Sequence, residues 1–137
     1  EHILNQTMCR MFHCGRSSSH HIEKKKSKCD YNLGRDITPE EQATIEQKVN
    51  EVINAGMAVT ASVVTPEEAL SRYSLERIPE GESSIRVVLV GDYDVCACSG
   101  NHVENTSEIG RFYISSHSFE NNVLRIRYKI EGVSEKY

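Results

Sequence analysis

The residues with the clearest capacity for chemistry lie in the turn Cys98-Ser99-Gly100-Asn101-His102. A thiolate and an imidazole four positions apart on a glycine-containing turn can bind one soft or borderline cation, and zinc is the commonest metal for that pair. We therefore predict zinc as a cofactor, with Cys98 and His102 as two of its ligands. Two donors do not complete a tetrahedral site, so the remaining donors must come from elsewhere in the chain.

The best candidate for a further donor is His2, at the opposite end of the sequence. Residues 1–8 have the character of a helix interior without a capping residue or a polar lead-in. A ligand four residues before His2 would share its helix face, because residues i and i+4 lie one above the other. That position precedes Glu1. We therefore expect a His, His, Cys, His site whose first histidine lies upstream of Glu1, on a helix that has lost its beginning.

A resemblance to a known family is carried by the run Cys98-x-Gly100-x-His102-Val103-x-Asn105-Thr106-x-Glu108-Ile109-Gly110-x-Phe112. This run resembles the second half of the editing domain of alanyl-tRNA synthetase, which is shared with free-standing alanyl-tRNA editing proteins and, more distantly, with threonyl-tRNA synthetase. The similarity extends through residues 28–31, 45–53 and 86–88. It implies that an HxxxH pair on the first helix and a CxxxH turn together hold zinc, with His2 as the second histidine of the pair.

The chain departs from the usual family pattern in two places. Ser99 and Asn101 replace the second and fourth residues of the usual Cys-Gly-Gly-Thr-His, and residues 122–128 replace the usual Gly-x-Arg-Arg-Ile-Glu-Ala. The zinc frame is kept, whereas the lining that would select a substrate differs.

Apolar periodicity predicts two long helices, one from Glu1 to about Cys14 and one that Thr38 caps and Gly56 ends. A short helix is expected from Thr65 to about Tyr73. Strands are expected over residues 20–26, 27–33, 57–64, 85–90, 109–116 and 123–130, the last two as a hairpin, with 85–90 as the central strand. The prediction is an α+β domain with a mostly antiparallel sheet, two main helices packed on it, and the zinc site between the first helix and the CxxxH turn.

The composition restricts the class of protein. A chain of 137 residues is the size of one domain, here residues 1–137. A net charge of −4 argues against a general nucleic-acid-binding protein. No apolar run approaches the roughly 20 residues that cross a bilayer, and no signal peptide is evident, so we expect no membrane association and a cytoplasmic location.

The five cysteines are odd in number and lack the spacing of a disulfide framework, so no disulfides are expected. Cys96-x-Cys98 could form a redox pair, but metal binding or simple packing is the favoured interpretation. His13 and Cys14 are interpreted as a surface imidazole and a small buried thiol rather than as ligands.

The function implied by the resemblance is that of a zinc-dependent deacylase acting in trans on mischarged aminoacyl-tRNA, with serine or glycine on alanine tRNA as the expected substrate. Gly100 would form the floor of a pocket, and the two candidate catalytic residues, Asn101 and Thr7, would lie on its sides. Their polar groups could distinguish a substrate with a hydroxyl from one with a methyl group. The alternative for Thr7 is a hydrogen bond back to its own helix. The alternative function is a non-catalytic zinc-binding module that binds tRNA or a protein.

A cluster of lysines, Lys24, Lys25 and Lys26 with Lys28 close by, is the candidate contact for tRNA phosphate. An equally strong interpretation is that these lysines protect a strand edge from aggregation.

Overall fold

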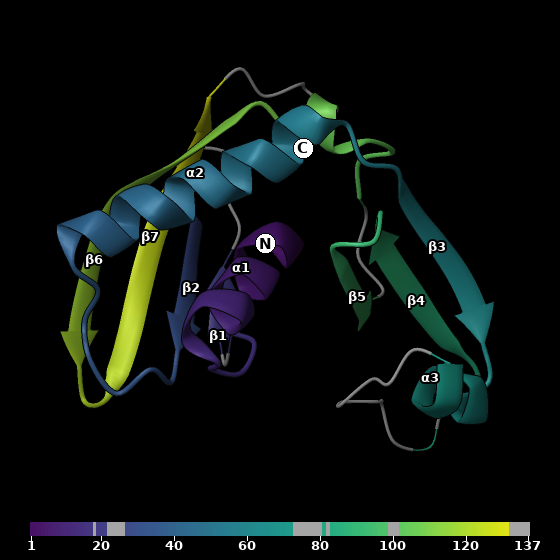
Figure 1. Cartoon of the computed structure of the whole chain (residues 1–137). Helices are drawn as coiled ribbons and strands as arrows, with labels where there is room; N and C mark the ends of the chain where they lie inside the picture. Colours follow the sequence, from purple (N-terminus) through teal and green to yellow (C-terminus); the bar gives the residue numbers. More distant parts are fainter. Residues whose placement is uncertain (18, 22–26, 73–80, 82, 99–101, 132–137) are drawn as a thin grey trace.

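The structure is a computed structural model, and it describes residues 1–17, 19–21, 27–72, 81, 83–98 and 102–131. Its elements, shown in Figure 1, are α1 (His2–Phe12), β1 (Ser19–His21), β2 (Ser27–Tyr31), α2 (Pro39–Ala55), β3 (Val59–Val64), α3 (Pro66–Arg72), β4 (Ile85–Val90), β5 (Asp94–Ala97), the 3₁₀ helix η1 (Thr106–Glu108), β6 (Arg111–Glu120) and β7 (Val123–Glu131). All strand pairs are antiparallel, which confirms the predicted α+β class. No helix within these residues is long and apolar enough to cross a membrane.

The strands form two sheets rather than the single one expected. One has the order β1-β2-β7-β6 and the other the order β3-β4-β5, and α1 lies between them (Figure 1). The chain leaves β5 through residues 98–110. In the described part of that segment the single strand-like contact is a bridge from Asn105 to Ala58, so β6 begins a separate sheet. The predicted central strand β4 is central in the smaller sheet.

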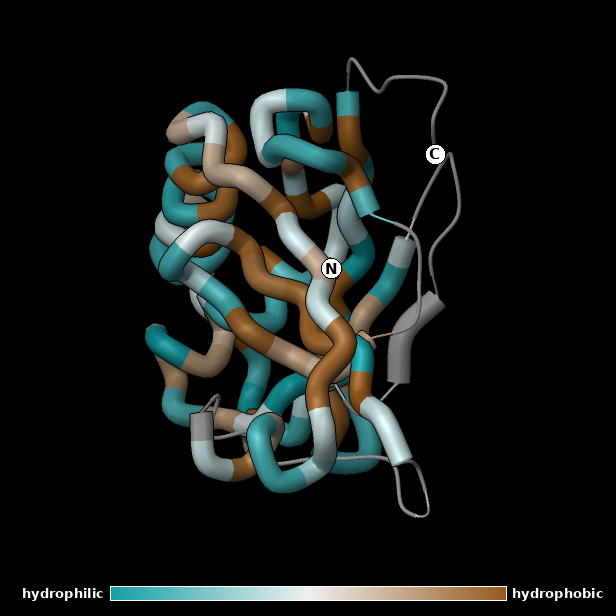
Figure 2. The backbone as a smooth tube through the Cα atoms, turned by 90° about the vertical axis from the view of Figure 1, so that its right-hand side faces the viewer, coloured by the Kyte–Doolittle hydropathy of each residue, from teal (hydrophilic) through white to brown (hydrophobic). Residues whose placement is uncertain are grey.

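The main core lies between α1, α2 and the inner face of the four-stranded sheet. Along β7, buried residues alternate with more exposed ones, as in a strand with one buried face. Figure 2 shows hydrophobic and hydrophilic residues interspersed along the backbone as a whole. The fully buried side chains include Leu4 and Met8 of α1, Ile45 of α2, Tyr31 of β2, and Leu124 and Ile126 of β7. Because α1 carries His2, this apolar packing fixes the position of the first candidate ligand.

Helix α2 begins and ends as the sequence predicts. The Thr38 hydroxyl accepts a hydrogen bond from the Glu41 amide at 3.1 Å, and the Glu41 carboxylate accepts one from the Thr38 amide at 2.9 Å, which is a capping box. Gly56 ends the helix with φ of 65°, a left-handed conformation that glycine adopts without strain.

Helix α2 also covers the open edge of β6. The Asn50 side chain accepts from the Phe112 amide and donates to the Phe112 carbonyl, each at 2.8 Å, and the Glu46 carboxylate accepts from the Ile114 amide at 2.8 Å. Exposed strand edges promote aggregation, and these side chains occupy the edge instead. Glu46 is therefore part of the contact between α2 and β6.

The predicted hairpin is confirmed, with β6 and β7 joined by a tight turn. Asn121 and Asn122 have φ of 51° and 62°, which is the backbone of a type I′ turn. Asparagine tolerates positive φ better than most residues, so this pair fixes the register of the two strands.

Thr106 connects α2 to the start of the smaller sheet. Its hydroxyl donates to the Val52 carbonyl and accepts from the Met57 amide, both at 2.9 Å, and its side chain is fully buried. The Thr106 amide also donates to the Met57 carbonyl at 2.9 Å. The segment that follows His102 is therefore fixed by hydrogen bonds to the end of α2.

We predict that Thr106→Val lowers the free energy of unfolding by about 2 kcal/mol, because the nearly isosteric valine leaves the partly buried Met57 amide without an acceptor. Thr106→Ser keeps the hydroxyl and removes one methyl, so its loss should be smaller, about 1 kcal/mol. Urea denaturation of both variants measures the difference. A valine variant as stable as the parent chain would show that this hydrogen bond is not needed.

Candidate metal centre

Three of the predicted ligands lie together at the junction between α1 and the smaller sheet. The His2 and His102 Nε2 atoms are 2.7 Å apart, and the Cys98 Sγ is 3.5 Å from the His102 Nε2. These three donor atoms all lie within 4.8 Å of one another. Residues separated by 100 positions in the sequence therefore present one sulfur and two nitrogens to the same region.

The donor set fits a tetrahedral zinc ion in type and nearly in spacing. On such an ion, a thiolate sulfur and an imidazole nitrogen are separated by about 3.5 Å and two imidazole nitrogens by about 3.3 Å, from Zn–S and Zn–N bonds of ~2.3 and ~2.0 Å. The observed sulfur–nitrogen distance of 3.5 Å matches, and the nitrogen–nitrogen distance of 2.7 Å is shorter. The shorter distance is that of a hydrogen bond between the two rings, which ligation would replace.

The other ring nitrogen of His2 faces β5. Its Nδ1 lies 3.4 Å from the Asp94 Oδ2 and 2.9 Å from the Cys96 Sγ. A histidine that binds a metal through one nitrogen commonly donates its other N–H to a carboxylate, which fixes the tautomer and the ring orientation. Asp94 is placed to do this for His2.

Asp94 is itself held by a buried ion pair. Arg16 donates to both carboxylate oxygens, at 2.7 and 3.1 Å, and Gln6 donates to one of them at 3.3 Å. Burial alone would raise the pKa of Asp94, but the hydrogen bonds and charges of His2 and Arg16 outweigh it, so the pKa is lowered. Asp94 is therefore an anion with no exposed side-chain surface.

A second group of potential metal donors shares His2 and consists of His2, Asp94 and Cys96. Arg16 already occupies both oxygens of Asp94. Burial raises the pKa of Cys96 to about 12, so its thiol stays protonated at neutral pH, whereas a metal needs the thiolate. The group of His2, Cys98 and His102 is chemically the better metal site.

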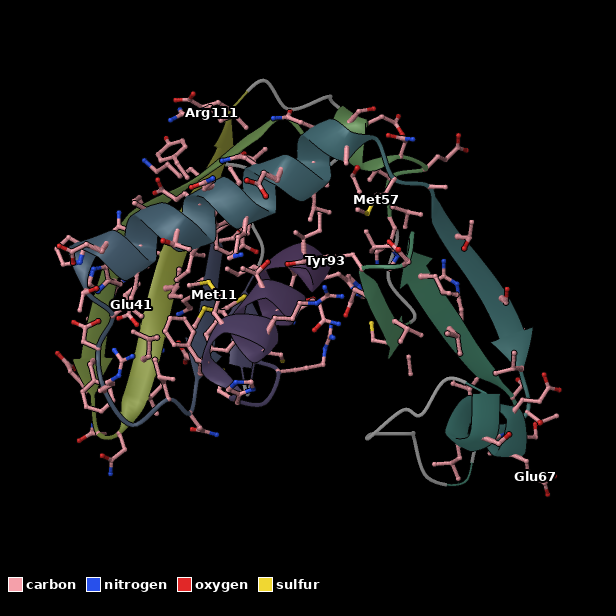
Figure 3. All side chains as sticks on the ribbon, viewed as in Figure 1. Met11, Glu41, Met57, Glu67, Tyr93 and Arg111 are labelled. Carbon is pink, nitrogen blue, oxygen red and sulfur yellow. The ribbon has the colours of Figure 1, made fainter. Side chains whose placement is uncertain are left out.

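Contacts of Arg10 with Tyr93 hold the turn between β4 and β5 against α1. They set the distance between His2 and the chain after β5. Arg10 donates to the Tyr93 carbonyl at 2.7 Å and its guanidinium lies 4.2 Å from the centre of the Tyr93 ring. Figure 3 shows Tyr93 between α1 and β5. Because Asp94 and Cys96 follow Tyr93 in the chain, these contacts orient β5 toward His2.

Thr7 is fully buried on α1. Its hydroxyl donates to the Ile3 carbonyl at 2.8 Å, the alternative that the sequence left open, and lies 2.6 Å from the Tyr93 hydroxyl, which can donate to it. The hydroxyl is thus engaged inside the core. The other predicted lining and contact residues, Gly100, Asn101, Lys24, Lys25 and Lys26, lie outside the described residues.

The sequence did not identify Asp94 and Cys96 as partners of His2, or Arg16 as the partner of Asp94. The one available signal was the helical spacing of His2 and Gln6, which lie four residues apart and both face Asp94. Of the remaining predictions, His13 is the exposed left-handed residue that ends α1, and Cys14 is half-buried.

We predict that Arg16→Leu lowers the free energy of unfolding by about 3 kcal/mol, because it leaves the buried Asp94 carboxylate without its cation. The matched control is Arg35→Leu, which breaks a bidentate pair with Glu41 on the exposed surface and should cost much less. Urea denaturation measures both. Equal losses would mean that Asp94 does not depend on Arg16.

Known proteins resemble this chain over most of its length. Residues 85–127 match the family described as threonyl and alanyl tRNA synthetase second additional domain. An alanine–tRNA ligase of Shouchella clausii is 33% identical over 138 aligned residues, which cover 98% of this chain and 15% of the ligase. One of Halalkalibacterium halodurans is 39% identical over 116 residues (84% and 13%), and one of Coxiella burnetii 38% over 98 residues (71% and 11%).

The chain thus spans between about a tenth and a quarter of the length of the curated relatives that it matches. The matched residues include β4, β5, Cys98, His102 and most of the β6–β7 hairpin. The chain is therefore related to the editing domain of alanyl-tRNA synthetase.

Proposed function

We propose that the cluster of His2, Cys98 and His102 binds one zinc ion. The observation that carries this proposal is the convergence of a sulfur and two nitrogens from α1 and the chain after β5 within 4.8 Å. Asp94 supports it, because a carboxylate behind a ligand histidine fixes the ring for metal binding. The proposed fourth ligand is the histidine that helical spacing places four residues before His2.

We predict that the chain binds about one zinc per molecule and that Cys98→Ala abolishes this, because the variant removes the thiolate of the donor group. Metal analysis after dialysis gives the stoichiometry. Cys14→Ala is the matched control and should keep the metal, since Cys14 donates to the Met8 carbonyl at 3.6 Å and is not part of the donor group.

Two further variants make the zinc test specific. Cys96→Ala should weaken zinc binding far less than Cys98→Ala, and the reverse order would place the metal at Asp94 and Cys96 instead. An N-terminal extension His-Ala-Ala should bind zinc more tightly than Ala-Ala-Ala, because its histidine lies one helical turn before His2. Equal affinities would remove the fourth ligand from the proposal.

We propose that this site hydrolyses the ester bond of mischarged aminoacyl-tRNA in trans, with serine or glycine on alanine tRNA as the substrate. A bound zinc would supply a Lewis acid that polarises a carbonyl or lowers the pKa of water toward ~7. His2, Cys98 and His102 would set where the 3′ end and the attacking water meet. Because an aminoacyl ester is already labile, positioning supplies most of the rate acceleration that is needed.

The residues proposed to select the substrate are Gly100 and Asn101, which lie between the two predicted ligands of the turn. A site that hydrogen-bonds a hydroxyl discriminates strongly, because its polar groups lose a partner with the wrong substrate. Thr7 would act indirectly, since its hydroxyl already bonds Ile3 and Tyr93 and so helps to hold β5 against α1. Lys24, Lys25 and Lys26 are proposed contacts for tRNA phosphate, and protection of a strand edge is the competing role. A cytoplasmic location follows from this substrate.

We predict that the zinc-loaded protein releases serine or glycine from mischarged alanine tRNA and leaves correctly charged alanine mostly intact. Deacylation across a panel of charged tRNAs measures this, with His2→Ala and Cys98→Ala as the variants that should lose activity. If zinc is bound at full occupancy and every ester survives at the uncatalysed rate, the deacylase proposal is wrong. The non-catalytic zinc-binding module, which the changed residues Ser99 and Asn101 favour, would then replace it.

A further inference from the structure

The outward face of the four-stranded sheet carries a concentration of positive charge. Along β7 the side chains of Leu124, Ile126 and Tyr128 are buried, so the alternate residues Arg125, Arg127 and Lys129 point away from the core. The strand register places Lys28 of β2 directly opposite Arg127, and Asp30 opposite Arg125. We call Lys28, Arg127 and Lys129 the basic face.

Asp30, an acidic residue in the middle of this surface, already forms an ion pair. Asp30 accepts from Arg125 at 2.8 and 3.0 Å, a bidentate pair. The hydrogen bond from Arg125 is the main reason that the pKa of Asp30 is lowered, with smaller contributions from the charges of Lys28 and Arg127. The charges of Asp30 and Arg125 therefore cancel, and the positive charge of the basic face remains in excess on this surface.

Among the residues that the structure describes, no carboxylate is paired with a residue of the basic face. Arg127 donates to the hydroxyls of Ser116 and Ser118, both at 3.3 Å, and hydroxyls carry no charge. Within the described part of the chain, none of Lys28, Arg127 and Lys129 forms an ion pair. Like charges directly opposite one another on a sheet are destabilising, so the pair of Lys28 and Arg127 carries a cost that a bound anion would remove.

The donors on this surface suit phosphate. A guanidinium flanked by two serine hydroxyls and two ammonium groups offers several hydrogen bonds to the oxygens of a phosphodiester. Cations on alternate residues of one strand lie about 6.7 Å apart and share one side of the sheet, so Arg127 and Lys129 can contact successive groups of an extended polyanion. The chain as a whole has a net charge of −4, so this concentration is local.

We propose that the basic face binds the phosphate backbone of tRNA away from its 3′ end, as a second contact surface besides the metal centre. The proposal rests on the proposed function for its choice of RNA. Helix α1, with His2, packs against the opposite, inner side of the same sheet, so this surface is separate from the metal centre.

Binding of uncharged tRNA tests this inference independently of ester hydrolysis. The test variant is Arg127→Gln with Lys129→Gln, and its control is Arg35→Gln with Lys48→Gln. Arg35 is already paired with Glu41, and Lys48 lies on α2, so the control makes the same change in net charge outside the basic face. Fluorescence anisotropy gives the affinity at several salt concentrations.

The test variant should bind tRNA on the order of 10-fold more weakly at moderate salt. Its slope of log K against log [salt] should become shallower by roughly 0.7–0.9 for each phosphate that the variant no longer neutralises. The control should change neither quantity appreciably. Equal weakening in both variants would mean that net charge alone drives binding, and an unchanged slope in the test variant would mean that the face does not contact phosphate. Either result overturns the inference.

Two further measurements separate the possible failures. Addition of tRNA should raise the melting temperature of the parent chain and of the control but not of the test variant, whose own urea midpoint checks that it folds. The test variant should still hydrolyse a short aminoacylated oligonucleotide that lacks the body of the tRNA. If no ester is hydrolysed, the deacylase proposal fails while the binding result stands. If hydrolysis persists and binding is unchanged, the basic face alone is rejected.

Discussion

The buried carboxylate of Asp94 is the constraint that organises this structure. A charged group without exposed surface is tolerated only when it is paired and hydrogen-bonded, and here Arg16, Gln6 and His2 all approach it. Two of these partners are on α1 and the third follows it, whereas Asp94 begins β5. Satisfying one carboxylate therefore holds the first helix against the smaller sheet, and it places His2 beside the chain that carries Cys98.

The candidate metal centre lies at the connection between two layers that share no strand. The first layer is the four-stranded sheet with α1 and α2, and the second is the sheet of β3, β4 and β5. Buried polar contacts connect them, among them those of Asp94 with α1 and of Thr106 with the end of α2. Buried hydrogen bonds fix α1, which carries His2, and also the segment that follows His102. The three donors are therefore held together by the fold itself.

The residues that carry the family resemblance serve structure as much as chemistry. Asn105 donates to the Gly56 carbonyl at 2.9 Å, and the Glu108 carboxylate accepts from the Asn105 amide at 2.9 Å. These contacts, with those of Thr106, shape the segment after His102 and engage all three side chains in its folding. A motif can therefore be specific for a family because it builds the frame around a site.

Local sequence patterns were enough to predict most of the helices and strands, although not β5, and the proximity of Cys98 and His102. Helical periodicity with a capping box defined α2, an Asn-Asn turn defined the β6–β7 hairpin, and the spacing of Cys98 and His102 predicted that they would meet. The packing of the elements, in contrast, divides the strands between two sheets, pairs Arg16 with Asp94 and engages the Thr7 hydroxyl in the core. Periodicity and capping depend on neighbours within a few residues, whereas a polar pairing across nearly 80 positions depends on how the elements pack, which no local pattern records.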